Sequence, residues 1–230
     1  MIKGKKVLAV IPARGGSKGI ARKNIRNVAG KPLLAWTVEE ARKSQYIDRL
    51  VLSSEDEEII ETAKGLGCEV PFVRPFELAR DDTPGVAPIL HAVDCIQGYD
   101  IVVMLQVTSP LRTVYDIDRC INLLFEKEAN ALVSVTSPDK SPYWMYTVDH
   151  QSNRMTPLLN LESLPLRRQD LKPAYALNGA VYVAKIDWFR EHKSFLTEET
   201  IAYIMPKDRS FDIDTEMDLS ICDFLLKQRA

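Results

Sequence analysis

The segment V7-L-A-V-I-P-A-R-G-G-S-K-G-I-A-R-K-N24 combines two features that decide the fold. Residues 7–11 form a short apolar run, which is typical of a buried strand. The run continues directly into a turn that holds three glycines, one serine and four cationic side chains. In open α/β sheets, ligands bind at the carboxyl ends of the strands. This stretch therefore predicts a strand of such a sheet that carries a ligand-binding loop at its end.

Outside this segment, short apolar runs alternate with stretches of helical period. Strands are expected at residues 49–53, 69–73, 101–106, 131–135, 180–184 and 201–205. Helices are expected at residues 32–44, 55–66, 86–96, 114–127, 186–192 and 215–227. In the last helix, the side chains expected to be buried are Met217, Ile221, Phe224 and Leu225. The alternation predicts an α/β fold, with a mostly parallel sheet covered by helices on both faces.

Residues 137–165 interrupt this alternation, because they show no helical period. They contain Tyr143, Trp144 and Tyr146, a polar turn at residues 149–153, and a second apolar run at residues 155–159. This order predicts a β-hairpin that projects from the sheet. Its aromatic side chains need cover, and we expect a second subunit to supply it.

Composition excludes several classes of function. The 230 residues are 46% hydrophobic and 27% charged, with a net charge of −2, which gives no global attraction for nucleic acid or an anionic membrane. No apolar run reaches the roughly 18 residues of a transmembrane helix. The four cysteines are widely separated and the three histidines are scattered, so neither pattern favours a disulfide framework, a zinc site or a Ser/His/Asp triad. We expect a cytoplasmic protein.

The charge is unevenly distributed, since the first 31 residues hold nine Lys or Arg and no Asp or Glu. Gly15, Gly16 and Gly19 allow the backbone to approach a ligand and to direct successive N–H groups toward it. Phosphate is the ligand that such a cationic turn favours. The turn lacks both G-x-x-x-x-G-K-[ST] and G-x-G-x-x-G, which disfavours a P-loop ATPase or an NAD enzyme. From the turn alone, a solvated basic loop remains an alternative.

Five motifs in order along the chain resemble the nonulosonic acid cytidylyltransferases, the CMP-sialic acid synthetase family. They are I11-P-A-R-G-G-S-K-G-I-A-R-K-N24, R74-P-F-E-L-A79, L105-Q-V-T-S-P-L-R112, R168-Q-D-L-K-P-A-Y-A-L-N-G-A-V-Y182 and D212-I-D-T-E-M-D218. These enzymes activate nine-carbon acidic sugars with CTP, and give a CMP-sugar and pyrophosphate. The resemblance implies one Rossmann-like nucleotidyltransferase domain over residues 1–230, with residues 137–170 inserted as a protruding β-rich dimerisation arm. It also implies a homodimer that exchanges these arms, and it leaves open whether dimers pair into tetramers.

The resemblance also assigns roles to residues that match the family's motifs. The residues it places on the nucleotide are Arg14, Ser17, Lys18, Lys23, Asn24, Arg74, Thr108 and Ser109. The residues it places on the sugar are Gln106, Arg168, Tyr182 and Phe195. The residues expected to contribute most directly to catalysis are Arg14, Lys18 and Asp214. Without the resemblance, Ser109 and Thr108 fit a Ser-Pro turn that caps the following helix, and Tyr182 fits a core position.

Asp212 and Asp214 flank Ile213 at an apparent strand end, where alternate residues face the same side. Both carboxylates can therefore meet one cation, and Mg²⁺ prefers oxygen ligands of this kind. The matching aspartates bind Mg²⁺ in the family, so the resemblance assigns the metal to this pair. The same residues also fit the start of a helix, with Asp214 as its N-cap, and the two roles can coexist.

Two departures from the family's pattern bear on the choice of sugar. Some sialic-acid members carry a lysine where this chain has S141-P-Y-W-M145, and an arginine where it has Ala176. The S141–M145 stretch is similar to members that use legionaminic-type sugars. The alternatives are a cytidylyltransferase for the eight-carbon sugar Kdo, a metal-dependent glycosyltransferase that uses the D-x-D of residues 212–214, and a nucleotide-binding dimer without activity.

Overall fold

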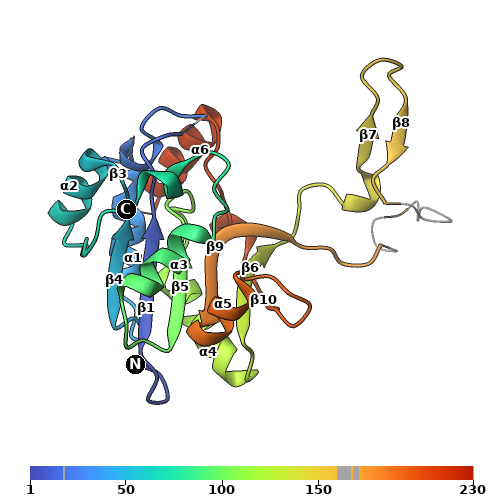
Figure 1. Cartoon of the computed structure of the whole chain (residues 1–230). Helices are drawn as coiled ribbons and strands as arrows, with labels where there is room; N and C mark the ends of the chain where they lie inside the picture. Colours follow the sequence, from blue (N-terminus) through green and yellow to red (C-terminus); the bar gives the residue numbers. More distant parts are fainter. Residues whose placement is uncertain (18, 160–166, 168–170, 230) are drawn as a thin grey trace.

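The computed structural model describes residues 1–17, 19–159, 167 and 171–229 (Figure 1). The strands in this part of the chain are β1 (Val7–Pro12), β2 (Asn27–Val28), β3 (Lys31–Pro32), β4 (Arg49–Ser53), β5 (Ile101–Leu105), β6 (Ala131–Thr136), β7 (Tyr146–Val148), β8 (Met155–Pro157), β9 (Ala176–Lys185) and β10 (Ile201–Ile204). The α-helices are α1 (Leu33–Arg42), α2 (Glu57–Gly65), α3 (Ala87–Cys95), α4 (Val114–Glu126), α5 (Ile186–His192) and α6 (Glu216–Lys227). No helix among the described residues is long and apolar enough to cross a membrane.

The centre of the fold is a six-stranded sheet in the order β10-β6-β9-β5-β1-β4. Strand β1 runs parallel to both of its neighbours, and β10 runs parallel to β6. Strand β9 is antiparallel to β5 and to β6. The sheet is therefore mostly parallel, as predicted, and the reversal of β9 is a feature that its apolar sequence alone did not reveal.

Helices cover both faces of the sheet because the strand side chains alternate between two cores. Val7, Ala9 and Ile11 of β1 face one core, which α1, α2, α4 and α6 cover. Leu8 and Val10 face the other, which α3 and α5 cover. An apolar residue at every position is the pattern expected for a strand buried on both faces.

The described structure corrects two expectations about individual elements. Residues 69–73 form only an isolated bridge between Glu69 and Val51, since Pro71 has no N–H to continue a ladder. In α6, Met217 is 72% exposed and Phe224 is 61% exposed. The buried side chains of α6 are Leu219, Cys222 and Leu226. Apolar residues occur on every side of this helix, so periodicity did not select the face that packs on the core.

Strands β7 and β8 form the expected hairpin, which projects away from the sheet (Figure 1). The Asp149 side chain stabilises its turn by accepting hydrogen bonds from the N–H groups of Gln151, at 2.9 Å, and Ser152, at 2.7 Å. All residues of both strands are exposed. The hairpin is thus confirmed, while its role as a dimerisation arm stays a prediction.

Candidate active site

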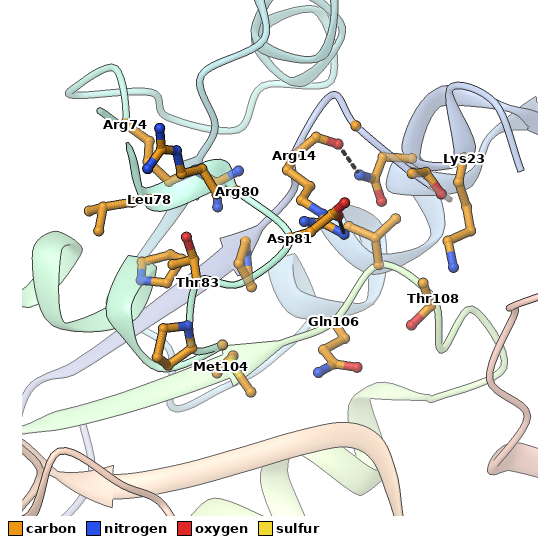
Figure 2. Close-up of a pocket in the computed structure, with 18 of the residues that line it drawn as sticks. Arg14, Lys23, Arg74, Leu78, Arg80, Asp81, Thr83, Met104, Gln106 and Thr108 are labelled. Atoms are coloured by element: carbon orange, nitrogen blue, oxygen red, sulfur yellow. Dashed lines mark hydrogen bonds and ion pairs between the residues drawn. The ribbon is translucent and has the colours of Figure 1, made fainter. Parts of the chain in front are cut away.

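A cavity of about 450 Å³ lies where β1 and β5 end. This is the edge of the sheet at which the sequence predicted a ligand, and the volume falls within the usual range for small-molecule sites. Eight of the predicted site residues line it: Arg14, Ser17, Lys23, Asn24, Arg74, Gln106, Thr108 and Asp214. Figure 2 labels Arg14 and Lys23 from the first loop, Arg74 from the segment after β4, and Gln106 and Thr108 from the end of β5; Asp214 comes from the segment before α6. The cavity thus joins residues that are far apart in the sequence.

The first loop is anchored by acidic residues that precede α2. The Gly15 N–H donates to the Glu55 carboxylate at 2.7 Å. The sequence predicted that this N–H would point toward a ligand, and that prediction is wrong. A Cβ on Gly15 would lie 2.3 Å from the Asp56 carboxylate, which explains why glycine is needed there. Arg22 donates to both oxygens of Asp56, at 2.5 and 2.9 Å.

Gly19 also serves packing within the chain, because a Cβ there would lie 2.3 Å from the Asp214 carbonyl oxygen. Gly16 has open space beside it and lines the cavity, as expected for a backbone that approaches a ligand. The Asn24 side chain donates to the Arg14 carbonyl at 2.9 Å, and so fixes the loop from within (Figure 2). Lys18 lies outside the described residues.

Two cationic side chains at the cavity, those of Arg74 and Arg14, are held by acidic partners. Arg74 is 3% exposed and donates to Glu55 at 2.5 Å from Nη2 and at 3.2 Å from Nε. Because Glu55 binds both Arg74 and the first loop, it ties two walls of the cavity together. Arg14 reaches across to Asp81, with 2.8 Å between Nη2 and the carboxylate.

The two aspartates of the D-I-D motif flank a buried Ile213, but they lie in an extended segment before α6 and not in a strand. The Ile213 N–H donates to the Thr108 carbonyl at 2.9 Å, which holds this segment against the end of β5. Lys23 donates to the Ile213 carbonyl at 2.7 Å and to the Asp214 carboxylate at 3.1 Å. The start of α6 is capped by Thr215 and Asp218, so Asp214 is free of the N-cap role.

The carboxylate of Asp212 lies in a crowded environment although its side chain reaches solvent. Partial burial raises the pKa of Asp212, a hydrogen bond with Thr108 counteracts this, and the charge of Asp214 raises the pKa further. The two carboxylates therefore sense each other, as groups that could share a cation do. Among the described residues, no cluster of three or more His, Cys, Asp or Glu side chains has metal-binding geometry. A cation here would thus take only part of its coordination from the protein.

The residues predicted for the sugar are only partly brought together. Gln106 lines the cavity, and its side-chain oxygen would lie 2.6 Å from a Cβ on Gly179. Tyr182 is half-buried, and Phe195 is 2% exposed with its ring 5.5 Å from that of Tyr182. Phe195 thus packs in the core of its own chain, and its placement on the sugar stays a prediction. Arg168 lies outside the described residues.

Ser109 does not reach the cavity either. It is fully buried, and its hydroxyl donates to the Asn178 carbonyl at 3.4 Å. The following helix, α4, is capped by Thr113, so the alternative in which the Ser-Pro turn caps this helix is wrong.

Sequence reasoning missed a wall of the cavity. It is formed by Leu78, which lies within the R74-P-F-E-L-A79 motif, and by residues that follow the motif, namely Arg80, Asp81, Thr83, Pro84 and Gly85. The turn-forming composition of R80-D-D-T-P-G85, directly after a matched motif, was the available signal.

A buried arginine braces the floor beneath the cavity. Arg112 is 1% exposed and donates to the carbonyls of Gln106, at 3.0 Å, and Ala180, at 2.8 Å. Its other terminal nitrogen donates to the Thr37 hydroxyl at 2.8 Å. Burial lowers the pKa of Arg112 to about 10, so it stays charged at neutral pH. The guanidinium links the end of β5 to β9 and thereby sets the position of Gln106.

Known proteins resemble this chain in sequence and in fold. The sequence pattern of a family described as cytidylyltransferase matches residues 8–218. The CMP-N,N'-diacetyllegionaminic acid synthase of Legionella pneumophila is 33% identical over 227 residues, which cover 96% of this chain and 97% of that protein. The pseudaminic acid cytidylyltransferase of Campylobacter jejuni is 33% identical over 229 residues, which cover 96% of this chain and 97% of that protein. A solved CMP:2-keto-3-deoxy-manno-octonic acid synthetase in complex with CTP has a TM-score of 0.73 and 15% identity, over 98% of this chain and 100% of that one, and so shares the fold.

Proposed function

Because this chain belongs to the cytidylyltransferase family, we propose that it transfers CMP from CTP to a nine-carbon acidic sugar and releases pyrophosphate. The observation that carries the proposal is the cavity at the ends of β1 and β5. Arg14 and Lys23 of the first loop line it together with Asp214, and the charge of Asp214 acts on Asp212, which lies outside the lining. Such a cavity suits a reaction in which one anionic substrate attacks the phosphate of another.

The first loop binds the triphosphate in this proposal. Arg14 and Lys23 neutralise charge on the phosphates, and the resemblance adds Lys18, Ser17 and Asn24 to the same loop. The Glu55 contacts with Gly15 and Arg74 hold these groups in place before the substrate arrives, which lowers the cost of binding. The sugar's anomeric hydroxyl attacks the α-phosphate, forms the new P–O bond and loses its proton to solvent. The bond between the α-phosphorus and the bridging oxygen breaks, and pyrophosphate leaves with its electron pair.

The D-I-D pair fits a magnesium ion. Asp212 and Asp214 offer carboxylate oxygens, and substrate phosphates would complete the coordination, as is usual for this metal. When bound, Mg²⁺ supplies charge neutralisation at the phosphates and lowers the pKa of an oxygen that it contacts. Lys23 contacts Asp214 at 3.1 Å, so this residue of the chain connects the carboxylate pair to the phosphate-binding loop.

The sugar lies beside Gln106 in this proposal, at the end of β5. By the resemblance, Arg168 captures the sugar carboxylate, for which a bidentate guanidinium is well suited. The relatives named above act on legionaminic and pseudaminic acids, and the S141–M145 stretch agrees with a legionaminic-type substrate. We propose a homodimer in which the β7–β8 arm covers the partner's sugar site. The four free cysteines suit the cytoplasm.

The test is pyrophosphate release from CTP and Mg²⁺ with separate N-acetylneuraminate, legionaminate, pseudaminate and Kdo substrates. Release with one nonulosonate would support the reaction and identify the sugar. Release with Kdo alone would show that the chain is a Kdo cytidylyltransferase and would contradict the proposed nine-carbon sugar. Binding of CTP without release in any reaction would favour a nucleotide-binding protein without activity, and consumption of a sugar nucleotide would favour a glycosyltransferase.

A further inference from the structure

The Arg14 guanidinium already binds an anionic group of its own chain. Its Nη2 lies 2.8 Å from the Asp81 carboxylate, and its Nη1 donates to the Ala79 carbonyl at 3.4 Å. Figure 2 shows Asp81 beside the Arg14 guanidinium within the cavity. Arg14 belongs to the first loop and Asp81 to the opposite wall, so this contact spans the space between them. A carboxylate oxygen thus occupies a position on Arg14 that a phosphate oxygen requires.

The segment that carries Asp81 can yield without disturbing the core. Of residues 80–85, only Thr83 is partly covered, and the others are exposed. The Thr83 N–H donates to the Arg80 carbonyl at 3.2 Å, and its hydroxyl donates to the Glu77 carbonyl at 2.9 Å. These are local turn contacts, which open at low cost compared with contacts in the core.

The exposure of the pair decides which anions can break it. The side chain of Arg14 is 34% exposed and that of Asp81 is 54% exposed, so their attraction is weakened by solvent. A triphosphate carries several negative charges, so it competes with the single Asp81 carboxylate for the Arg14 guanidinium. The same charges also repel the carboxylate. Pyrophosphate carries fewer charges, and a CMP-sugar carries only one phosphate group beside the guanidinium. The Asp81 carboxylate therefore displaces these products from Arg14 more easily than it displaces CTP.

We propose that Asp81 is an internal competitor for phosphate at Arg14, which weakens the binding of CTP and pyrophosphate and speeds the release of products. This inference rests on the proposed function, since it concerns how the same cavity handles the nucleotide. It assigns Asp81 a role as a specificity-determining residue, because a ligand must carry enough phosphate charge to displace it.

The experiment measures the affinity of wild type, Asp81→Asn and Asp82→Asn for CTP and for inorganic tripolyphosphate by calorimetry. Asp82 is exposed and lies outside the cavity lining, so its variant removes the same charge without touching Arg14. We expect Asp81→Asn to bind both ligands about two- to fivefold more tightly, the gain expected from removing an exposed ion pair. We expect Asp82→Asn to change affinity less than this, and pyrophosphate to inhibit Asp81→Asn more strongly than wild type.

Equal or weaker binding by Asp81→Asn would overturn the inference, and weaker binding would show that Asp81 supports the ligand. Tripolyphosphate separates this outcome from a failure of the proposed function. If the wild type binds tripolyphosphate but not CTP, the proposed function fails, and the comparison between variants still tests Asp81. If no variant binds either ligand, both proposals are contradicted.

Discussion

Gly179 has a left-handed backbone, with φ of +71°, and it contacts the side chain of Gln106. Alanine at this position would be strained by about 1–2 kcal/mol and would also displace the Gln106 amide. We therefore expect Gly179→Ala to raise the KM for the sugar and to lower the melting temperature. Gly98 is the matched control, because its φ is +86° but a Cβ there would meet no atom within 4 Å. Gly98→Ala should lower stability and leave the KM unchanged; an equal KM for the two variants would contradict the placement of the sugar.

Asp214 offers the most direct test of the metal assignment. Its side chain is 74% exposed, so Asp214→Asn should leave the fold intact. We expect turnover to fall by about 100-fold or more, as for the loss of one group that stabilises the charge of the transition state. Glu216→Gln is the control, since Glu216 lies two residues further on and outside the cavity lining. Pyrophosphate release across a range of Mg²⁺ concentrations provides the measurement, and near-normal turnover in folded Asp214→Asn would remove Asp214 from the metal site.

The residues that sequence reasoning found and those that it missed differ in a physical way. Arg14 and Lys23 were found because they follow a strand at the edge of the sheet where ligands bind, whereas Asp214 was found through the family resemblance, since its segment is not a strand. Glu55 and Asp81 were missed because their importance comes from contacts with Gly15 and Arg14, which only the folded chain brings close. Phe195 was assigned by loose similarity alone, and it lies in a core that no local pattern could reveal.

At the scale of elements, Asp116 connects α4 to the segment that leads to the D-I-D motif. It is fully buried, takes part in the capping box with Thr113, and accepts two hydrogen bonds from Arg209, each of 2.9 Å. Burial alone would raise the pKa of Asp116, but the hydrogen bonds from Arg209 and Thr113 outweigh it, so the pKa is lowered. Asp116→Asn leaves Arg209 without its anionic partner.

A lowered pKa means that the folded state favours the ionised carboxylate. Its stabilisation is complete above the pKa of the unfolded chain, about 4, and is lost as the pH falls through the lower folded value. We expect Asp116→Asn to reduce the free energy of unfolding by about 3 kcal/mol at neutral pH. Urea unfolding at a series of pH values should show this difference shrinking in acid. A difference that is independent of pH would contradict the ionic account.

Helix α6 provides a test of which face packs on the core. Leu226→Ala should lower the free energy of unfolding by about 2–4 kcal/mol, because it opens a cavity in the core. Phe224→Ala should change it by no more than about 0.5 kcal/mol, since that ring is 61% exposed. Chemical denaturation of both variants provides the measurement. A larger loss of stability in Phe224→Ala than in Leu226→Ala would show that the face expected from the sequence packs on the core.

The sequence predicted most elements because each strand carries a continuous apolar run and each helix a recognisable start or end. Residues 49–53 and 186–192 match β4 and α5 at both ends. Strand direction could not be predicted in the same way, because a parallel and an antiparallel strand buried on both faces have the same apolar pattern. Strand β9 is reversed because the chain returns from the β7–β8 arm.

At the scale of the whole molecule, the arm should determine the oligomeric state. Val148 and Met155 face each other across the hairpin, and they are 45% and 62% exposed. We expect the wild type to sediment as a dimer, and the double variant Val148→Ser/Met155→Ser to shift toward the monomer with lower turnover. Met217→Ser, which changes a side chain on α6 that is 72% exposed, should remain dimeric. A monomeric wild type, or an unchanged dimer in the double variant, would contradict the role of the arm.

In the proposed reaction, the anomeric oxygen of the sugar attacks the α-phosphate of CTP. The most direct test is ³¹P nuclear magnetic resonance of a reaction with a nonulosonate labelled with ¹⁸O at the anomeric hydroxyl. We expect a CMP-sugar whose phosphorus signal carries the isotope shift, since the labelled oxygen becomes the bridge, and pyrophosphate without label. A product without the bridging label, or label in the pyrophosphate, would contradict the claim.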